Sequence, residues 1–243
     1  EILRTECAAL REVLSKQPIP NEMQAAIRDI LEQWPADTAF AIRSSSTFED
    51  LGDAAFAGQH DTYLNCVGVT EILEKVRECW LSLWTDRAVL YRHSRGFPHG
   101  MAAMAVVVQQ QIACEVAGVA FSINPVSGAL HSVVIDANYG LGESVVSGEF
   151  EVDHFEVDAK THRVTQQVLG KKSKCILPER QGTRLADVPE EKQGDPCLKE
   201  SQVAEIAALA KSVQQHYSWP QDIEWGYAGG RYYLLQSRPV TTI

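Results

Sequence analysis

The sequence predicts an α+β fold in which mainly antiparallel sheets are flanked by helices. Apolar residues recur at helical spacing near the N-terminus, in residues 70–95 and in residues 201–217. The rest of the chain consists of short β-type runs joined by turns, which is typical of hairpins and antiparallel pairing. With 243 residues, of which 45% are hydrophobic, one large domain with a sizeable core can account for the chain.

Residues 1–36 are predicted to be a helical lead-in. Residues 1–16 carry a helical apolar stripe and read as a charged helix, not as a signal peptide. Asn21 is placed to cap a second helix, which ends near Pro35. Residues 37–243 are then predicted to form the main part of the domain.

This main part begins with the strand TAFAIRSS and a polar loop, and DTYLNCV is the strand that returns. Residues 70–95 are expected to form one long helix, capped by Thr70 and ended by Gly96 and Pro98.

The middle and the end of the chain are predicted to be rich in β-structure. NPVSG at 124–128 has strong turn chemistry, and residues 140–150 form a loop punctuated by glycines. Residues 170–200 are polar without clear periodicity and are expected to be a surface excursion, before a helix that Ser201 opens. The predicted strands are MAVVVQQQI, VAGVAFSI, HSVVIDANY, a hairpin in EVDHFEVDAKTHRV and a second hairpin in DIEWGYAGGRYYLLQSRPV.

Charge and cysteine usage exclude several classes of protein. The formal net charge of −10 argues against general binding to nucleic acid or to anionic membranes, which needs clustered positive charge. No apolar run approaches the length of about 18 residues that a membrane span requires. The six cysteines have scattered spacing and no CxxC motif, which favours reduced thiols and a cytoplasmic location.

The stretch after Arg43 has the chemistry of a phosphate site. A guanidinium is a planar fork that suits phosphate oxygens, and the serine and threonine hydroxyls that follow can add donors. Gly58 would let the backbone approach a polyphosphate closely. An ordinary surface loop in which Arg43 pairs with Glu49 or Asp50 explains the same residues equally well.

The C-terminal hairpin can place four polar side chains on one face. Asp222 and Glu224 are two residues apart on one strand, and Gln236 and Arg238 have the same spacing on the next. Two carboxylates and an amide oxygen suit Mg²⁺ that bridges phosphates, and the arginine suits a phosphate itself. The alternative is a solvent-facing side of an antiparallel sheet with an ion pair across the strands.

Three consecutive glutamines follow a buried strand in VVVQQQIACEVAGV. A strand end that offers one N–H and one C=O beside apolar side chains can pair with the edge of an adenine. A polar strand end at the surface is the simpler alternative.

Four long motifs, taken together, resemble a known family. IRSSSTFEDLGDAAFAGQHDTYLN, VVVQQQIACEVAGVAFSINPVSG, DANYGLGESVVSGEF and DIEWGYAGGRYYLLQSRPV are similar, in this order, to the ATP-binding domain of the phosphoenolpyruvate synthase and pyruvate phosphate dikinase family. Rifampicin phosphotransferases share this domain. The resemblance covers about residues 38–243.

This resemblance implies an ATP-grasp fold, ATP and Mg²⁺ as cofactors, and a dikinase-type reaction. A phosphoryl group would pass to a histidine on a separate phosphohistidine domain of the same protein, which carries it to pyruvate or, in relatives, to an antibiotic. By motif, Arg43 contacts phosphates, and Gly58 and Gln59 belong to the loop over the triphosphate. The residues implied to lie along the adenine are Gln109, Gln110, Gln111 and Ile112.

The C-terminal motif implies the metal site. Glu224 and Gln236 would hold Mg²⁺, with Asp222 nearby, and Arg238 would reach the phosphates. The resemblance thus implies that Arg43 and Arg238 are the catalytic cations.

Two departures from the family pattern concern the ends of the chain. The family has a glycine-rich segment with a phosphate-binding lysine upstream of the RSS motif, whereas the roughly forty residues before Arg43 contain none. Phosphohistidine and pyruvate-binding motifs are also missing. We therefore expect a piece of a larger phosphotransferase that is inactive alone; the alternatives are an antibiotic phosphotransferase and a docking module that has lost ATP binding.

Overall fold

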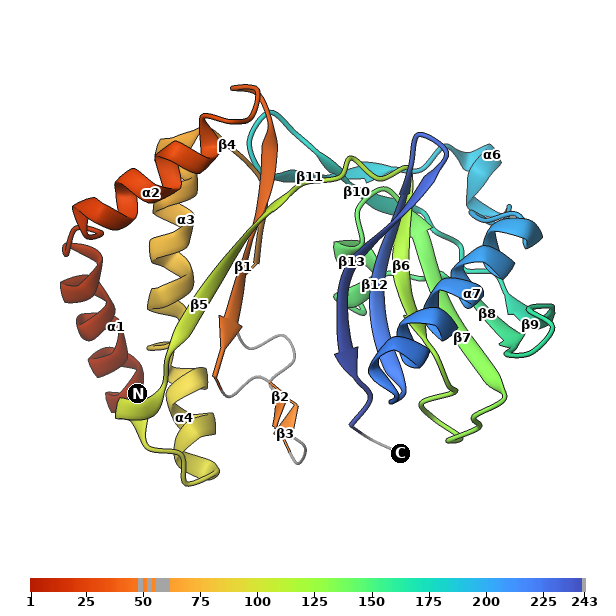
Figure 1. Cartoon of the computed structure of the whole chain (residues 1–243), viewed down its shortest axis with the longest axis horizontal. Coiled ribbons are helices and arrows are strands. Elements are labelled where there is room, and N and C mark those ends of the chain that lie inside the picture. The colour runs from red at the N-terminus through yellow and green to blue at the C-terminus, as the bar shows by residue number, and fades with distance from the viewer. Residues whose placement is uncertain (48–49, 52–53, 56–61, 242–243) are drawn as a thin grey trace. The chain divides into compact units, whose positions relative to one another are not determined.

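The computed structural model describes residues 1–47, 50–51, 54–55 and 62–241, with the backbone alone at 50–51 and 54–55. The chain divides into two compact units (Figure 1). Unit 1 comprises Glu1–Gln111 and Glu179–Gly182, and unit 2 comprises Ile112–Pro178 and Thr183–Ile243. All paired strands in both units are antiparallel, with helices packed on the sheets, so the predicted α+β class is confirmed.

Unit 1 is a three-stranded antiparallel sheet, in the order β4-β1-β5, packed against helices. Buried side chains of β1 and α3 form its core, among them Phe40, Ile42, Ile72 and Val76. The elements are α1 (Ile2–Ser15), α2 (Asn21–Leu31), β1 (Ala39–Ser46), β2 (Asp50–Leu51), β3 (Ala54–Ala55), β4 (Thr62–Val67), α3 (Val69–Ser82), α4 (Asp86–Ser94), a 3₁₀ turn (His99–Met101) and β5 (Met104–Gln110).

The prediction of one long helix over residues 70–95 is wrong in one respect, because the segment forms two helices, α3 and α4. The Thr85 hydroxyl accepts a hydrogen bond from the Ala88 amide at 3.2 Å and caps α4, so the chain restarts a helix there. The first of the two helices begins at Val69, and Thr70 is not its cap. Instead, the Glu71 carboxylate reaches back to the Val67 amide at 2.9 Å.

Unit 2 is built on a six-stranded antiparallel sheet, in the order β13-β12-β6-β7-β8-β9. One face packs against α7 around Ile223, Trp225, Phe155 and Ile206, which are at most 2% exposed. The elements are β6 (Val116–Phe121), β7 (Ser132–Tyr139), α5 (Glu143–Val146), β8 (Asp153–Asp158), β9 (Val164–Val168), β10 (Lys174–Pro178), β11 (Thr183–Asp187), α6 (Glu190–Gln193), α7 (Glu200–Tyr217), β12 (Gln221–Ala228) and β13 (Arg231–Pro239).

The predicted turn at NPVSG joins β6 and β7. Asn124 Oδ1 accepts hydrogen bonds from the amides of Val126 and Ser127, both at 3.0 Å, and Gly128 has a φ of +71°. The glycine-rich stretch after β7 contains a position at which the structure requires glycine. Gly140 has a φ of +75°, and a Cβ there would lie 2.2 Å from the carbonyl oxygen of Ile176.

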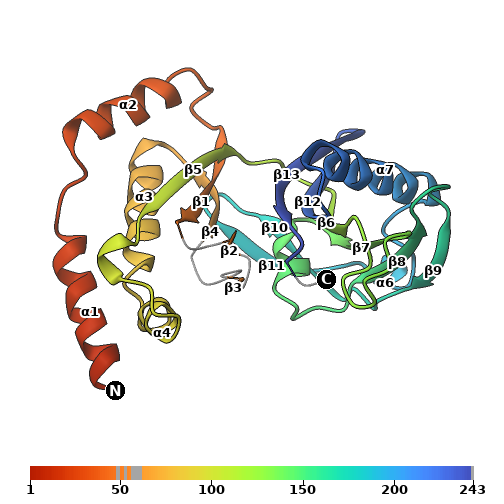
Figure 2. The same cartoon turned by 60° about the horizontal axis from the view of Figure 1, so that its bottom comes forward.

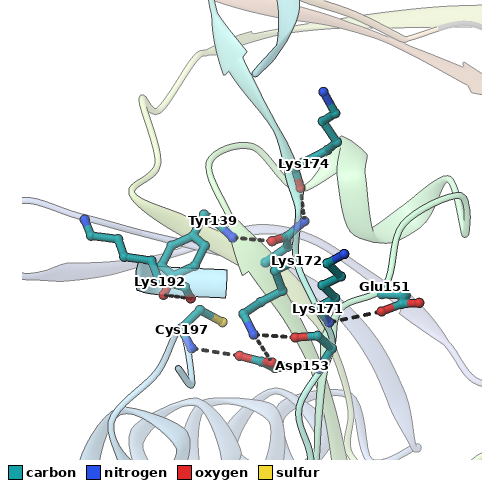
Figure 3. A network of polar contacts seen from close by, with 10 residues as sticks. Tyr139, Glu151, Asp153, Lys171, Lys172, Lys174, Lys192 and Cys197 are labelled. Carbon is teal, nitrogen blue, oxygen red and sulfur yellow. Dashed lines mark hydrogen bonds and ion pairs between the residues drawn. The ribbon is translucent and has the colours of Figure 1, made fainter. Parts of the chain in front are cut away.

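Most of residues 170–200, predicted as a surface excursion, are exposed or half-buried, but the segment also has regular structure that the sequence did not indicate. The segment forms the antiparallel pair β10–β11 and the short helix α6. A buried ion pair ties it to the sheet: Lys172 Nζ lies 2.6 Å from Asp153 Oδ1, and neither side chain is exposed (Figure 3). The Asp153 carboxylate also accepts hydrogen bonds from the amides of Gly170, at 3.1 Å, and Cys197, at 2.7 Å.

All six cysteines are buried free thiols. Burial raises the pKa of Cys66 and of Cys114 to about 11, so both are protonated at neutral pH. Across the described part of the chain, no helix combines the length and apolarity needed to cross a membrane.

Candidate functional site

The C-terminal hairpin places the four predicted side chains as two directly paired rungs. Asp222 lies opposite Arg238, and Glu224 lies opposite Gln236. Directly opposite residues of an antiparallel pair project from the same face of the sheet. Ile223 and Trp225 point to the other face, into the core under α7. The predicted shared face is therefore confirmed as geometry.

Only one of the two carboxylate oxygens of Asp222 is hydrogen-bonded among the described residues. Arg238 Nε donates to Asp222 Oδ2 at 2.8 Å. Oδ1 of the same carboxylate is buried and has no hydrogen-bond partner among the described residues. Burial raises the pKa of Asp222 above its ordinary value, and the charge of Arg238 only partly offsets this effect.

An unpartnered buried carboxylate oxygen is what a bound cation would satisfy. Glu224 and Gln236 are half-buried on the neighbouring rung and would add one carboxylate and one amide oxygen. The described residues contain no group of three or more His, Cys, Asp or Glu that could hold a metal ion. Two carboxylates and an amide oxygen are nevertheless the hard oxygen donors that suit Mg²⁺, which is commonly held by one or two carboxylates together with substrate phosphates.

The rung of Glu224 continues across the sheet. Glu224 pairs with Val119, Val119 with Asp136, and Asp136 with His154. His154 Nδ1 lies 2.7 Å from Asp136 Oδ1, and both side chains are half-buried. Sequence reasoning did not single out this pair, because only the register of three strand pairings places it in line with Glu224.

In unit 1, Arg43 projects from β1 on the face opposite the core residues Phe40 and Ile42. Its Nη1 donates to Oε1 of Gln109 on β5 at 3.4 Å. Arg43 lies opposite Val107, so Gln109 is its diagonal neighbour on the same face. The structure thus brings one predicted phosphate residue and one predicted adenine residue together.

The serines after Arg43 continue the strand, since β1 extends to Ser46. Thr47 closes the β1–β5 ladder: its amide donates to the Ala103 carbonyl at 3.1 Å, and its hydroxyl accepts from the Ala103 amide at 3.2 Å. The Thr47 hydroxyl therefore has a structural role at the end of this ladder.

The predicted adenine residues run along the segment that leaves β5. Gln110 is the last residue of β5, and the Gln111 amide donates to the Ala39 carbonyl at 2.8 Å. Ile112 begins unit 2. Gly58 and Gln59, and the side chains of the alternative partners Glu49 and Asp50, lie outside the described residues.

Antiparallel sheets with flanking helices in both units are consistent with a domain of the ATP-grasp type. Comparison of the sequence with protein families agrees: the family described as "Pyruvate phosphate dikinase, AMP/ATP-binding domain" matches residues 1–243. The chain belongs to this family.

The relatives include proteins of two names. The chain is 38% identical to a probable phosphoenolpyruvate synthase of Pyrococcus horikoshii over 99% of its length, and 42% identical to one of Archaeoglobus fulgidus over 90%. It is 40% identical to a rifampicin phosphotransferase of a Streptomyces species over its full length. The alignments cover 31%, 29% and 28% of these relatives, so the chain spans about a third of their length or less.

Proposed function

We propose that the chain is the ATP-binding domain of a larger, cytoplasmic phosphotransferase of the phosphoenolpyruvate synthase type. The domain would position ATP and Mg²⁺ for transfer of a phosphoryl group to a histidine on a separate domain of the same protein. The observation that carries the proposal is the pair of rungs Asp222–Arg238 and Glu224–Gln236, found in a chain whose whole length matches an AMP/ATP-binding family. The share of each relative that the chain covers supports a larger protein.

Each residue of the hairpin would have a distinct task. Glu224 and Gln236 would hold Mg²⁺, which neutralises phosphate charge when bound. Asp222 would fix the guanidinium of Arg238 through the 2.8 Å hydrogen bond and offer its second oxygen to the metal. Arg43, beside Gln109, would contact phosphates from unit 1. Phosphoryl transfer depends mainly on such positioning and charge neutralisation.

The proposal is tested by nucleotide binding in the whole protein. Titration calorimetry with ATP and Mg²⁺ should show binding that Glu224→Ala weakens at least tenfold. Glu200→Ala, which removes an exposed carboxylate at the start of α7, should leave the affinity unchanged. Absence of ATP binding by the unsubstituted protein would favour the alternative of a docking module.

The phosphoryl acceptor separates the two enzyme alternatives. Pyruvate-dependent formation of AMP from ATP supports the phosphoenolpyruvate synthase type, and rifampicin-dependent formation supports the antibiotic phosphotransferase. The second alternative is kept because rifampicin phosphotransferases align with the chain as completely as the synthases do. Residues 1–243 alone should not convert ATP and pyruvate to AMP at a rate near that of the whole protein, because the phosphohistidine is proposed to lie on another domain.

A further inference from the structure

Unit 1 contains a polar pocket of about 440 Å³ among its helices. Helix α1 packs against α3 and α4 (Figure 2), and the pocket lies along this contact. The α1 side of the pocket carries Arg11, Glu12 and Ser15, and the α3 side carries Glu78 and Ser82. The described residues that are proposed to bind nucleotide or metal do not line it, so the pocket is separate from the proposed nucleotide site.

Two arginines at this contact have buried N–H groups that nothing satisfies. The Nε atoms of Arg11 and Arg77 are both buried, and neither has a hydrogen-bond partner among the described residues. Arg77 also donates through Nη1 to the Ser15 carbonyl at 3.3 Å. Because Arg11 and Ser15 are four residues apart on α1, the two guanidinium groups lie at the same end of that helix. A buried donor without an acceptor lowers stability unless a bound molecule supplies one.

The carboxylates of the pocket do not neutralise these two arginines. Glu12 lies 2.8 Å from Lys16, and Glu78 lies 2.9 Å from Lys75, so each carboxylate already has a lysine as its cation. Within the described part of the chain, neither arginine has a carboxylate partner. Two guanidinium charges thus remain uncompensated at one end of α1, in a chain whose net charge is −10.

We propose that this pocket binds a small molecule that carries a phosphate group, which Arg11 would hold and Arg77 would help to neutralise. A guanidinium offers a planar edge of N–H groups that matches phosphate oxygens. A phosphate monoester carries about −1.5 to −2 charges at pH 7, which balances two arginines better than a single carboxylate does. The volume is in the range of small-molecule pockets, roughly 300–1,000 Å³, and Tyr63 and Leu81 would line the organic part of the ligand.

Two other occupants would satisfy the arginines less completely. A water molecule would accept a hydrogen bond but would leave both charges uncompensated. An acidic side chain from a part of the polypeptide outside residues 1–243 would bring one charge, and it would occupy the pocket without any added ligand. The inference does not depend on the proposed function, since it uses none of the residues proposed to act on ATP.

Hydrogen exchange in the whole protein, with inorganic phosphate as the probe, tests the proposal. The amides of α1 and α3 should exchange at least threefold more slowly in saturating phosphate than in sodium chloride of the same ionic strength. Sodium acetate of the same ionic strength should have a much smaller effect, because acetate carries a single charge.

Matched variants assign the protection to this pocket and not to phosphate bound elsewhere. Arg11→Gln removes the proposed ligand, whereas Arg28→Gln removes an exposed arginine of α2 that does not line the pocket. The phosphate concentration that gives half-maximal protection should rise at least tenfold in Arg11→Gln and should not change in Arg28→Gln. If Arg11→Gln does not fold, Arg11→Lys takes its place and should also weaken binding, because a lysine keeps the charge but not the planar fork.

Three results would overturn the proposal. The first is that phosphate gives no protection, as expected if an acidic segment of the same polypeptide already fills the pocket. The second is protection that Arg11→Gln leaves unchanged, which would place the bound phosphate at another site. The third is equal protection by acetate and by phosphate, which would show that the pocket does not select for a phosphate group.

Discussion

Two carboxylate–cation pairs in unit 2 have opposite surroundings. Asp153 and Lys172 are wholly buried, and their polar atoms are engaged: Asp153 accepts from Lys172, Gly170 and Cys197, and Lys172 also donates to the Gly170 carbonyl at 2.7 Å (Figure 3). In the pair of Asp222 and Arg238 the side chains are 9% and 31% exposed, and one carboxylate oxygen is unsatisfied.

From this difference we propose that the first pair is structural and that the second pair binds a ligand. A buried charge is tolerated when each of its hydrogen-bonding positions is filled, and the Asp153 network joins β8, the approach to β10 and the approach to α7. A carboxylate that is buried but only half satisfied lowers stability unless something else binds it. We therefore expect substitutions at the first pair to change stability and substitutions around the second to change activity.

The largest effect should come from breaking the structural pair. Lys172→Ala leaves the Asp153 carboxylate buried without its cation, which should lower the free energy of unfolding by about 3–5 kcal/mol. Chemical denaturation of the two proteins measures the difference. The control is replacement of the neighbouring Lys171, whose side chain is exposed. Its amide donates to Glu151, and none of the described interactions joins it to Asp153, so the free energy of unfolding should change little. A loss below about 1 kcal/mol in Lys172→Ala would remove the contrast between the two pairs.

The next effect should appear in activity and not in stability. Glu224→Ala removes a proposed metal ligand, which should lower kcat/KM in the whole protein by about 10²- to 10³-fold, equivalent to about 3–4 kcal/mol. Glu200→Ala should have no comparable effect. Steady-state kinetics and melting curves of both variants give the answer, and equal mild losses would contradict the metal assignment.

Of the two pairs, only the placement of Asp222 and Arg238 on one face could be predicted from the sequence, because the alternation of side chains in a hairpin is a local property. The spacing of Asp222 with Glu224, and of Gln236 with Arg238, fixes their shared face once the turn between them is recognised. Turn chemistry likewise predicted the NPVSG connection. The hairpin and the turn depend on residues that are close together in the sequence, so their pattern of residue types predicts them directly.

Contacts between distant positions could not be predicted in this way. Lys172 stands in a polar stretch that suggests a surface segment, and only the fold buries it against Asp153. Asp136 and His154 come into line with Glu224 through the register of successive strands, which no single strand encodes. The break between α3 and α4 was not predicted because the apolar stripe continues across it. In the structure, Thr85 caps α4 and starts a new helix.

Arg43 extends the comparison to unit 1. If Arg43 holds phosphate oxygens through its planar fork, Arg43→Lys should not rescue Arg43→Ala, because a lysine offers only a point charge on a flexible stem. We expect each variant to lose about 1.5–3 kcal/mol of transition-state stabilisation, or roughly tenfold or more in kcat/KM. The melting temperature should barely change.

Kinetics of the two Arg43 variants in the whole protein test this expectation. Near-normal turnover in Arg43→Lys would show that charge alone suffices. The surface-loop alternative, in which Arg43 pairs with Glu49 or Asp50, would then be preferred, and such a pair is worth less than about 1 kcal/mol.

The smallest effect is expected in the stability of Asp222→Asn, and its sign follows from the raised pKa. A carboxyl whose pKa is raised in the folded state binds its proton more tightly there than in the unfolded chain, so its ionisation costs stability as the pH rises above its ordinary value of 3.8. The asparagine variant does not titrate and escapes this cost, although it weakens the contact with Arg238. The two terms oppose each other, and the net change at neutral pH should stay within about 1 kcal/mol.

Urea denaturation of Asp222→Asn and of the unsubstituted protein, at pH values from 4 to 7, tests that sign. The difference in unfolding free energy should shift in favour of the variant as the pH rises, while ATP turnover in the whole protein falls because an amide is a weaker metal ligand and a weaker partner for Arg238. A loss of about 3 kcal/mol, as expected for Lys172→Ala, would mean that Asp222 and Arg238 form a second structural pair. The division between a pair that stabilises the fold and a pair that binds ligand would then no longer hold.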